Sequence, residues 1–106
     1  MDDVGRLVGK VDSYSKLIKQ LKGSGLQAHH IIEKRFSNTL GLKASQMQCV
    51  ALTKTEHQVF TNAWRNRIAY GTNYSELGVG KIWEVVQEIY SEYPKLLEAA
   101  RSSLFH

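Results

Sequence analysis

The chain has 106 residues, of which 42% are hydrophobic and 23% charged, a composition typical of one globular domain and not of a disordered segment. Its formal net charge of +4 favours an anionic partner, although many basic domains bind nothing acidic. The single cysteine, Cys49, excludes an internal disulfide, and its apolar setting predicts a buried thiol.

No apolar run approaches the roughly 20 residues that a membrane-spanning helix needs. The N-terminus alternates polar and apolar residues, so we expect no cleavable signal peptide. If the protein is exported, we expect the address to lie outside this chain.

Residues 1–22 are predicted to form an amphipathic helix, because apolar side chains recur at three- and four-residue steps from Val4 to Leu21. Gly23 is a suitable end for it. We expect this helix to contribute packing and to expose its lysines, which are Lys16, Lys19 and Lys22.

The segment from about Leu26 to Ile32 is predicted to be a short strand or an extended loop that carries the adjacent pair His29 and His30. Neighbouring residues on a strand point to opposite faces, so one histidine would face the core and the other a cleft. At a bend or a strand end, both would reach one site. A pair of imidazoles can hold a cation with one member and accept a proton with the other.

A polar connection over Ser37–Gln46 leads to a second predicted strand, Gln48–Leu52. Two strands this short would be marginal alone and need a helix packed across them. That helix follows at once, with Thr53 as N-cap and Glu56 completing a capping box.

This helix is predicted to run to about Tyr70, with Gly71 ending it and His57 in its first turn. Its apolar stripe consists of Phe60, Ala63, Trp64 and Ile68. Two further helices are predicted, one over the apolar positions from Ile82 to Tyr90 and one that begins at Pro94. We expect Trp64 and Trp83 to belong to the core and not to stack on bases.

The order of elements predicts an α+β, mostly helical domain that spans residues 1–106. A β-hairpin packed on the following helix would bring His29, His30 and His57 into one cleft. His57 alone would more often be a core histidine. The pair and the strand–strand–helix order favour a functional site.

From Leu26 to about Trp64, the chain resembles the HNH/endonuclease VII (His-Me finger) superfamily of nucleases. Within it, the chain is similar to the bacterial toxin nucleases named for an Ala-His-His motif. The matching residues are Ala28-His29-His30-Ile31-Ile32, then Val50-Ala51-Leu52-Thr53 and Glu56-His57. The resemblance implies a ββα-metal core at about residues 26–70, with a short β-hairpin and flanking helices.

The resemblance also implies the roles of the histidines: His29 and His57 as ligands of a divalent metal ion (Mg, Mn, Zn or Ni) and His30 as the general base. A neutral imidazole suits activation of water near pH 7, and a divalent ion suits phosphate neutralisation. Glu33 is a further candidate catalytic residue, which would complete the coordination or simply pair with a neighbouring cation. Two positions depart from the family pattern, Gln48 where an asparagine is usual and Thr61 where some members have another histidine.

By position, Arg35 and Arg65 are candidate contacts to the phosphates of nucleic acid. The resemblance implies an endonuclease that acts on DNA more readily than on RNA. It further implies the C-terminal domain of a larger secreted bacterial toxin that acts in the cytoplasm of the target cell. Such a toxin implies an acidic cognate immunity protein that complements this basic chain.

The alternative is a non-catalytic nucleic-acid-binding module in which the histidines hold a structural metal. Structural zinc prefers four protein ligands, usually with cysteines. Three histidines and one distant cysteine do not offer that pattern, so the nuclease is the favoured reading.

Overall fold

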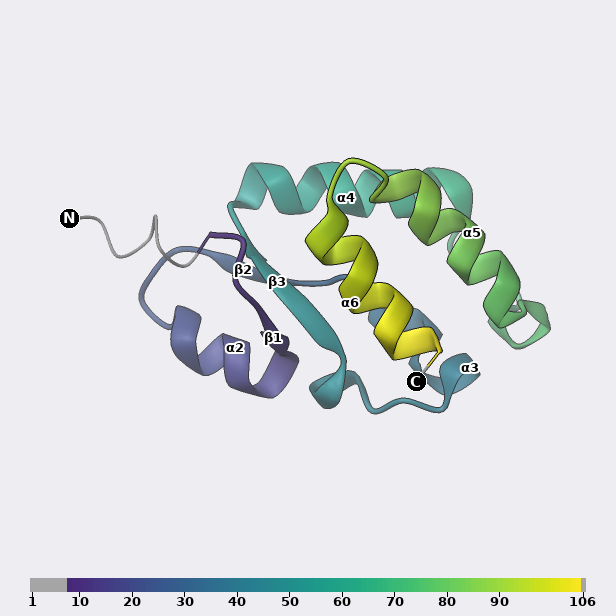
Figure 1. Ribbon diagram of the computed structural model, residues 1–106, viewed down its shortest axis with the longest axis horizontal. Coiled ribbons are helices and arrows are strands. Elements are labelled where there is room, and N and C mark those ends of the chain that lie inside the picture. Colours follow the sequence, from purple (N-terminus) through teal and green to yellow (C-terminus); the bar gives the residue numbers. More distant parts are fainter. Residues whose placement is uncertain (1–7, 106) are drawn as a thin grey trace.

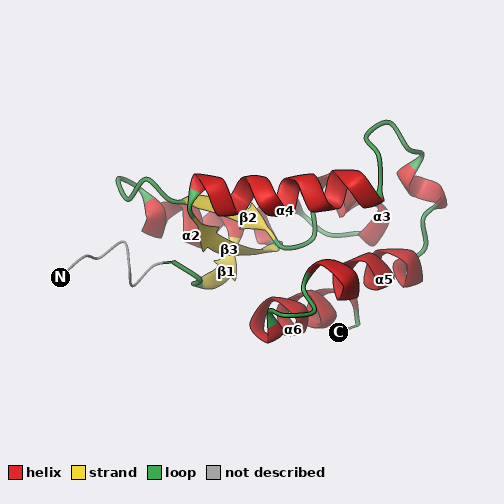
Figure 2. Cartoon of the chain, turned by 90° about the horizontal axis from the view of Figure 1, so that it is seen from above, coloured by secondary structure: helices red, strands yellow, loops and turns green. Residues whose placement is uncertain are grey.

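The computed structural model describes residues 8–105 and shows a small antiparallel sheet with helices on both of its faces (Figures 1 and 2). The strand order is β1-β3-β2, which leaves β2 at one edge. The α+β class predicted from the sequence is confirmed. The strands are β1 (Val11–Ser13), β2 (Gln27–His30) and β3 (Gln48–Leu52).

The α-helices are α2 (Tyr14–Leu21), α3 (Ser37–Leu40), α4 (Lys54–Arg67), α5 (Val79–Ile89) and α6 (Pro94–Leu104). Between residues 8 and 105, the structure also has three short 3-10 helices, η1 (Lys34–Phe36), η2 (Ala44–Gln46) and η3 (Tyr74–Glu76). In the part of the chain that the structure describes, no helix has the length and apolarity needed to cross a membrane.

The alternation of side chains along β3 divides the core into two parts. Cys49 and Ala51 pack with Leu17 and Leu21 of α2 on one face. Val50 and the other core residues lie on the opposite face with α4, α5 and α6 (Figure 2). Cys49 is fully buried, as the sequence predicted.

The N-terminal prediction is wrong in its extent. Val11–Ser13 forms a strand paired with β3, and the helix begins only at Tyr14. The physical reason lies at Gly9, whose φ of 87° a right-handed helix cannot contain. After Gly9, the carbonyl oxygen of Lys10 accepts a hydrogen bond from the backbone N–H of Ala51. The chain then continues as β1. Residues 1–7 of the predicted helix lie outside the described part of the chain.

Both strands of the predicted hairpin are confirmed and pair antiparallel, with His29 opposite Val50 and His30 opposite Cys49. The connection between them is more ordered than expected, because it contains α3 and η2. Gly41, with a φ of 68°, ends α3 in the left-handed conformation that glycine adopts readily.

The capping box of α4 is present in full: the Thr53 side chain accepts from the Glu56 backbone, and the Glu56 carboxylate accepts from the Thr53 backbone. The helix ends at Arg67, earlier than predicted, because Ile68 turns into an extended conformation. Arg35 donates to the carbonyls of Ile68 and Ala69, which fixes the chain outside the helix.

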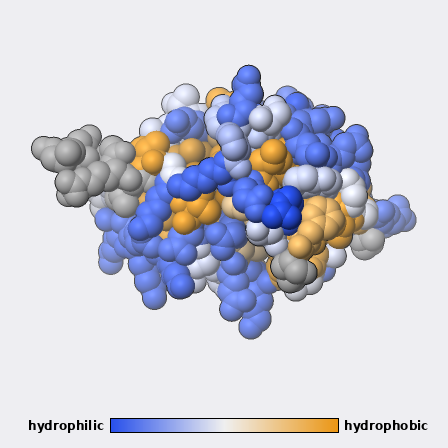
Figure 3. All heavy atoms as spheres, in the orientation of Figure 1, coloured by the Kyte–Doolittle hydropathy of each residue, from blue (hydrophilic) through white to orange (hydrophobic). Residues whose placement is uncertain are grey.

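The surface of the face drawn in Figure 3 is mostly hydrophilic, and its hydrophobic patches are separated by charged side chains. Trp64 is fully buried and Trp83 packs against the core, as predicted. The lysines of α2 are exposed, as predicted.

We expect Thr53→Ala to lower the free energy of unfolding by roughly 0.5–2 kcal/mol, because the first turn of α4 loses its capping bonds. Urea denaturation measures this change. Thr55→Ala is the matched control, since Thr55 is exposed in the same turn and should leave stability nearly unchanged. Equal stability of the Thr53→Ala variant and the wild type would show that the cap contributes nothing.

Candidate functional site

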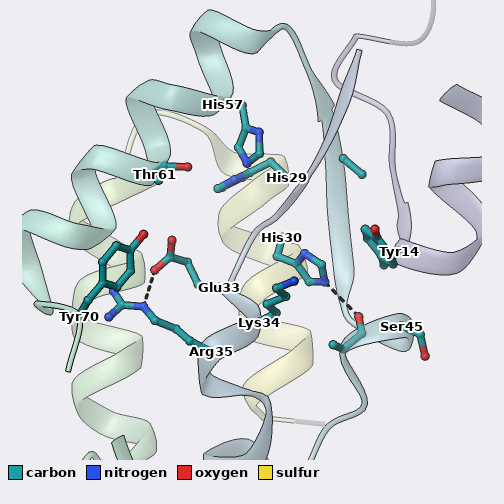
Figure 4. A pocket seen from close by; sticks show the side chains of 12 residues that line it. Tyr14, His29, His30, Glu33, Lys34, Arg35, Ser45, His57, Thr61 and Tyr70 are labelled. Atoms are coloured by element: carbon teal, nitrogen blue, oxygen red, sulfur yellow. Dashed lines mark hydrogen bonds and ion pairs between the residues drawn. The ribbon is translucent and has the colours of Figure 1, made fainter. Parts of the chain in front are cut away.

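The edge position of β2 allows His29 and His30 to line the same cavity, although they point to different faces of the sheet. The cavity has a volume of about 480 Å³ and is bounded by β2, η1, η2 and α4 (Figure 4). Its lining includes all three candidate histidines. It is completed by Tyr14, Ala28, Glu33, Lys34, Arg35, Ala44, Ser45, Thr61 and Tyr70.

His29 is the deepest of the three histidines, with only 2% of its surface exposed. Its Nε2 lies 2.9 Å from the hydroxyl of Tyr90, the residue that follows α5, and its ring stacks on Phe60. Burial lowers the pKa of His29 to about 3, and the nearby charges of His57 and His30 add to this. The imidazole is therefore neutral at pH 7.

His57 reaches the cavity from the first turn of α4. Its Nδ1 donates to Oε1 of Gln27, at 2.6 Å, because an amide oxygen can only accept. The second nitrogen, Nε2, then carries a lone pair. Burial lowers the pKa of His57, although the carboxylate of Glu33 acts in the opposite direction.

The structure brings the rings of His29 and His57 together, as the strand–strand–helix order predicted. Their centroids are 5.0 Å apart and the rings meet edge to face (Figure 4). Among residues 8–105, the structure has no group of three histidine, cysteine or acidic side chains placed to hold a metal ion. The two imidazoles are the neighbouring pair of side chains that could hold a cation in this cavity.

His30 lies next to this pair and is held by the backbone. Its Nε2 donates to the carbonyl oxygen of Ala44, at 3.0 Å, so Nδ1 carries the lone pair. The ring stacks on Tyr14, with centroids 4.8 Å apart. Burial lowers the pKa of His30, the hydrogen bond to Ala44 acts in the opposite direction, and the charge of Lys34 lowers the pKa further. A neutral imidazole with one nitrogen fixed and the other free has the form of a general base.

Glu33 and Arg35 form an ion pair at 2.6 Å on the wall of the cavity. The same guanidinium donates to the Tyr74 hydroxyl and to the carbonyls of Ile68 and Ala69. Most of its five N–H groups are therefore engaged. Arg35 was predicted to contact phosphate, but the structure shows it joining η1 to the chain beyond α4.

Arg65, the other predicted phosphate contact, does not line the cavity. It is exposed on α4, bonds to Asn62 and lies over the ring of Tyr70, 5.5 Å from its centroid. Lys34 lines the cavity and is exposed, and its ammonium group has no hydrogen bond or ion pair with a described residue. The sequence analysis did not single out Lys34 as a site residue.

Tyr14, Ser45, Tyr70 and Tyr90 were not identified as site residues from the sequence. The sequence placed Tyr90 among the apolar positions of a predicted helix. Its ring is fully buried, but its hydroxyl makes polar contacts that this prediction did not include. It lies 61 positions from His29, so no local pattern connects the two. Thr61 does line the cavity, at the position where the resemblance placed another histidine in some members.

We expect the metal-free protein to lose stability as the pH falls below 6.5. The unfolded chain then protonates His29, whereas the folded chain keeps it neutral down to about pH 3. The contribution is fully present above pH 6.5, and its slope approaches about 1.4 kcal/mol per pH unit for one histidine. Urea denaturation from pH 7 to pH 5 in a chelator tests this, above the range in which carboxylates titrate.

A His29→Gln variant is the control, because glutamine does not titrate and its slope should be smaller. A wild-type stability that stays constant from pH 7 to pH 5 would contradict the burial of neutral histidines.

Comparisons of the chain with protein-family models, with curated proteins and with solved structures find no significant match.

Proposed function

We propose that this protein is a metal-dependent endonuclease that hydrolyses phosphodiester bonds of nucleic acid, with DNA as the favoured substrate over RNA. The observation that carries the proposal is the arrangement of three histidines around one cavity. His29 and His57 lie side by side, and His30 is fixed beside them with a free Nδ1. The proposal includes the finer architecture, a ββα-metal core formed by β2, β3 and α4.

The two neighbouring imidazoles fit a divalent cation. Imidazole nitrogens bind zinc at about 2.0–2.1 Å and the ring centroid lies about 1.1 Å behind, so two rings on one tetrahedral ion have centroids about 5 Å apart. The observed separation is 5.0 Å. One nitrogen of each ring is already hydrogen-bonded, His29 to Tyr90 and His57 to Gln27, and such bonds orient the histidine ligands of metal sites.

A cation held by His29 and His57 would supply neutralisation of phosphate charge and stabilisation of the leaving oxygen. The chain itself supplies the proton transfer. Nδ1 of His30 accepts a proton from the water that attacks phosphorus, and the carbonyl of Ala44 holds the ring by its Nε2–H. The Ala44 contact also stabilises the imidazolium that forms, since the Nε2–H bond strengthens when the ring is charged.

Glu33 lies within the same cavity, close enough for its charge to raise the pKa of His57. We propose that it retains its ion pair with Arg35 and adds negative charge beside the cation site. The ion pair keeps the carboxylate in place on the cavity wall.

The alternative function is a nucleic-acid-binding module with a structural metal, for which Cys49 would be a candidate ligand. The setting of Cys49 does not support that role. Its thiol is fully buried, bonds to the carbonyl of Met47 and does not line the cavity. Burial raises its pKa to about 12, whereas a zinc ligand must be a thiolate.

We expect His30→Ala to abolish cleavage while leaving the fold and the affinity for nucleic acid nearly intact, because its role is proton transfer. Nicking of a supercoiled plasmid, and cleavage of an RNA of similar length, measure the activity with Mg²⁺, Mn²⁺, Zn²⁺ or Ni²⁺ and with EDTA. Ser45→Ala, an exposed position in the same cavity, is the matched control and should retain activity.

Three results would contradict the proposal. Near-normal nicking by His30→Ala would exclude it as the base. Cleavage unaffected by EDTA would exclude the metal. An inactive wild type, with every ion and both substrates, would exclude the nuclease.

Phosphate binding provides a separate prediction. We expect Lys34→Ala and Arg65→Ala to weaken binding to all sequences and to flatten its salt dependence by about one unit of slope each. Lys34 lines the cavity with its ammonium unpaired among the described residues, and Arg65 lies beside the cavity residue Tyr70. Arg35→Ala should also lower the free energy of unfolding, because it removes four hydrogen bonds made by the guanidinium group.

Fluorescence anisotropy with a labelled duplex at several salt concentrations measures the slopes. Lys19→Ala, exposed on α2 and outside the cavity, is the control. A larger effect of Lys19 than of Lys34 would place the nucleic-acid surface on α2.

We further propose that the domain acts as the cytotoxic part of a secreted bacterial toxin, with an acidic immunity protein as its partner. The support is the resemblance of the Ala28-His29-His30 segment together with the net charge of +4.

A further inference from the structure

The hydroxyl of Tyr90 is a buried junction between three segments that are distant in the sequence. The residue is fully buried, and its Oη lies 2.9 Å from Nε2 of His29 and 3.0 Å from Nε1 of Trp64. It also donates to the carbonyl oxygen of Ile31, at 2.5 Å. The junction thus joins β2 and the residue that follows it to α4 and to the end of α5.

Counting donors and acceptors assigns the proton on His29. A phenol has one O–H donor, and the Ile31 carbonyl, which can only accept, takes it. The indole of Trp64 can only donate, so it occupies one acceptor site of the Tyr90 oxygen. The remaining contact requires His29 to donate through Nε2.

The neutral ring of His29 therefore has its lone pair on Nδ1. The described residues contain no buried side-chain nitrogen or oxygen without a hydrogen bond, and no described residue bonds to Nδ1. This nitrogen must therefore reach the surface of the cavity that His29 lines. It is the nitrogen available to a cation.

We propose that Tyr90 is a positioning residue of the site, which fixes His29 in the Nε2–H tautomer and so presents the Nδ1 lone pair to the metal. The metal part of this inference rests on the proposed function, whereas the tautomer does not. It makes the C-terminal part of the chain, through α5, a component of the site and not merely a cover for the sheet.

The test has two readouts on the full chain. Long-range ¹⁵N–¹H NMR of the metal-free protein reports which imidazole nitrogen of His29 carries the proton. Calorimetric titration with Zn²⁺ reports affinity. We expect the Nε2–H form in the wild type. In Tyr90→Phe we expect loss of this single tautomer and Zn²⁺ binding weaker by about 10–100-fold.

Two variants separate positioning from a general structural effect. Tyr93→Phe makes the same chemical change three residues on, at an exposed residue whose hydroxyl has no hydrogen bond to a described residue, and should change neither readout. Trp64→Phe removes another bond of the same junction but leaves the His29 contact. It should preserve the tautomer even if it lowers stability.

An Nδ1–H tautomer of His29 in the wild type would overturn the inference, and this measurement needs no variant to fold. Wild-type Zn²⁺ affinity in a folded Tyr90→Phe protein would also overturn it. A wild type that neither binds Zn²⁺ nor cleaves nucleic acid would remove the proposed function and with it the metal role of Tyr90. The NMR result would still decide whether Tyr90 sets the tautomer.

Discussion

The hydrogen-bonded junction at the Tyr90 hydroxyl is the interaction on which the geometry of the site depends. Polar groups buried in a core are costly unless they are paired, and here His29, Trp64 and the Ile31 carbonyl are all paired at one oxygen. This mutual satisfaction gives the edge strand β2 a single position relative to α4 and α5. Without it, the short strand would be held on that side by the His57–Gln27 hydrogen bond and by apolar contacts, which are not directional.

A second junction acts at the other end of the cavity. Arg35 joins Glu33 to the carbonyls that follow α4, and the rings of Tyr70 and Tyr74 lie close to its guanidinium. The interaction ends the helix at a defined residue and places the acidic side chain on the cavity wall. A residue that the sequence analysis identified as a candidate phosphate contact thus acts as a structural link in the folded chain.

Burial explains both the packing and the chemistry of the three histidines. Removal from water disfavours the charged form of an imidazole, so the pKa values of all three are lowered. Each ring also has one nitrogen fixed by a hydrogen bond, to Tyr90, Ala44 or Gln27. The result is a set of oriented lone pairs near neutral pH, which is the form that both metal binding and proton abstraction require.

The sequence alone determined the elements whose signals are local. The capping box at Thr53 and the short apolar strand Gln48–Leu52 are recognised from neighbours a few residues apart. With the element order, they also predicted that His29 and His57 would share a cleft, and the two rings do meet. Only the tertiary structure decided β1, the partners of Arg35 and the contact of His29 with Tyr90. These depend on a glycine conformation and on pairs of residues far apart in the chain, and periodicity carries no information about which distant polar groups will satisfy one another.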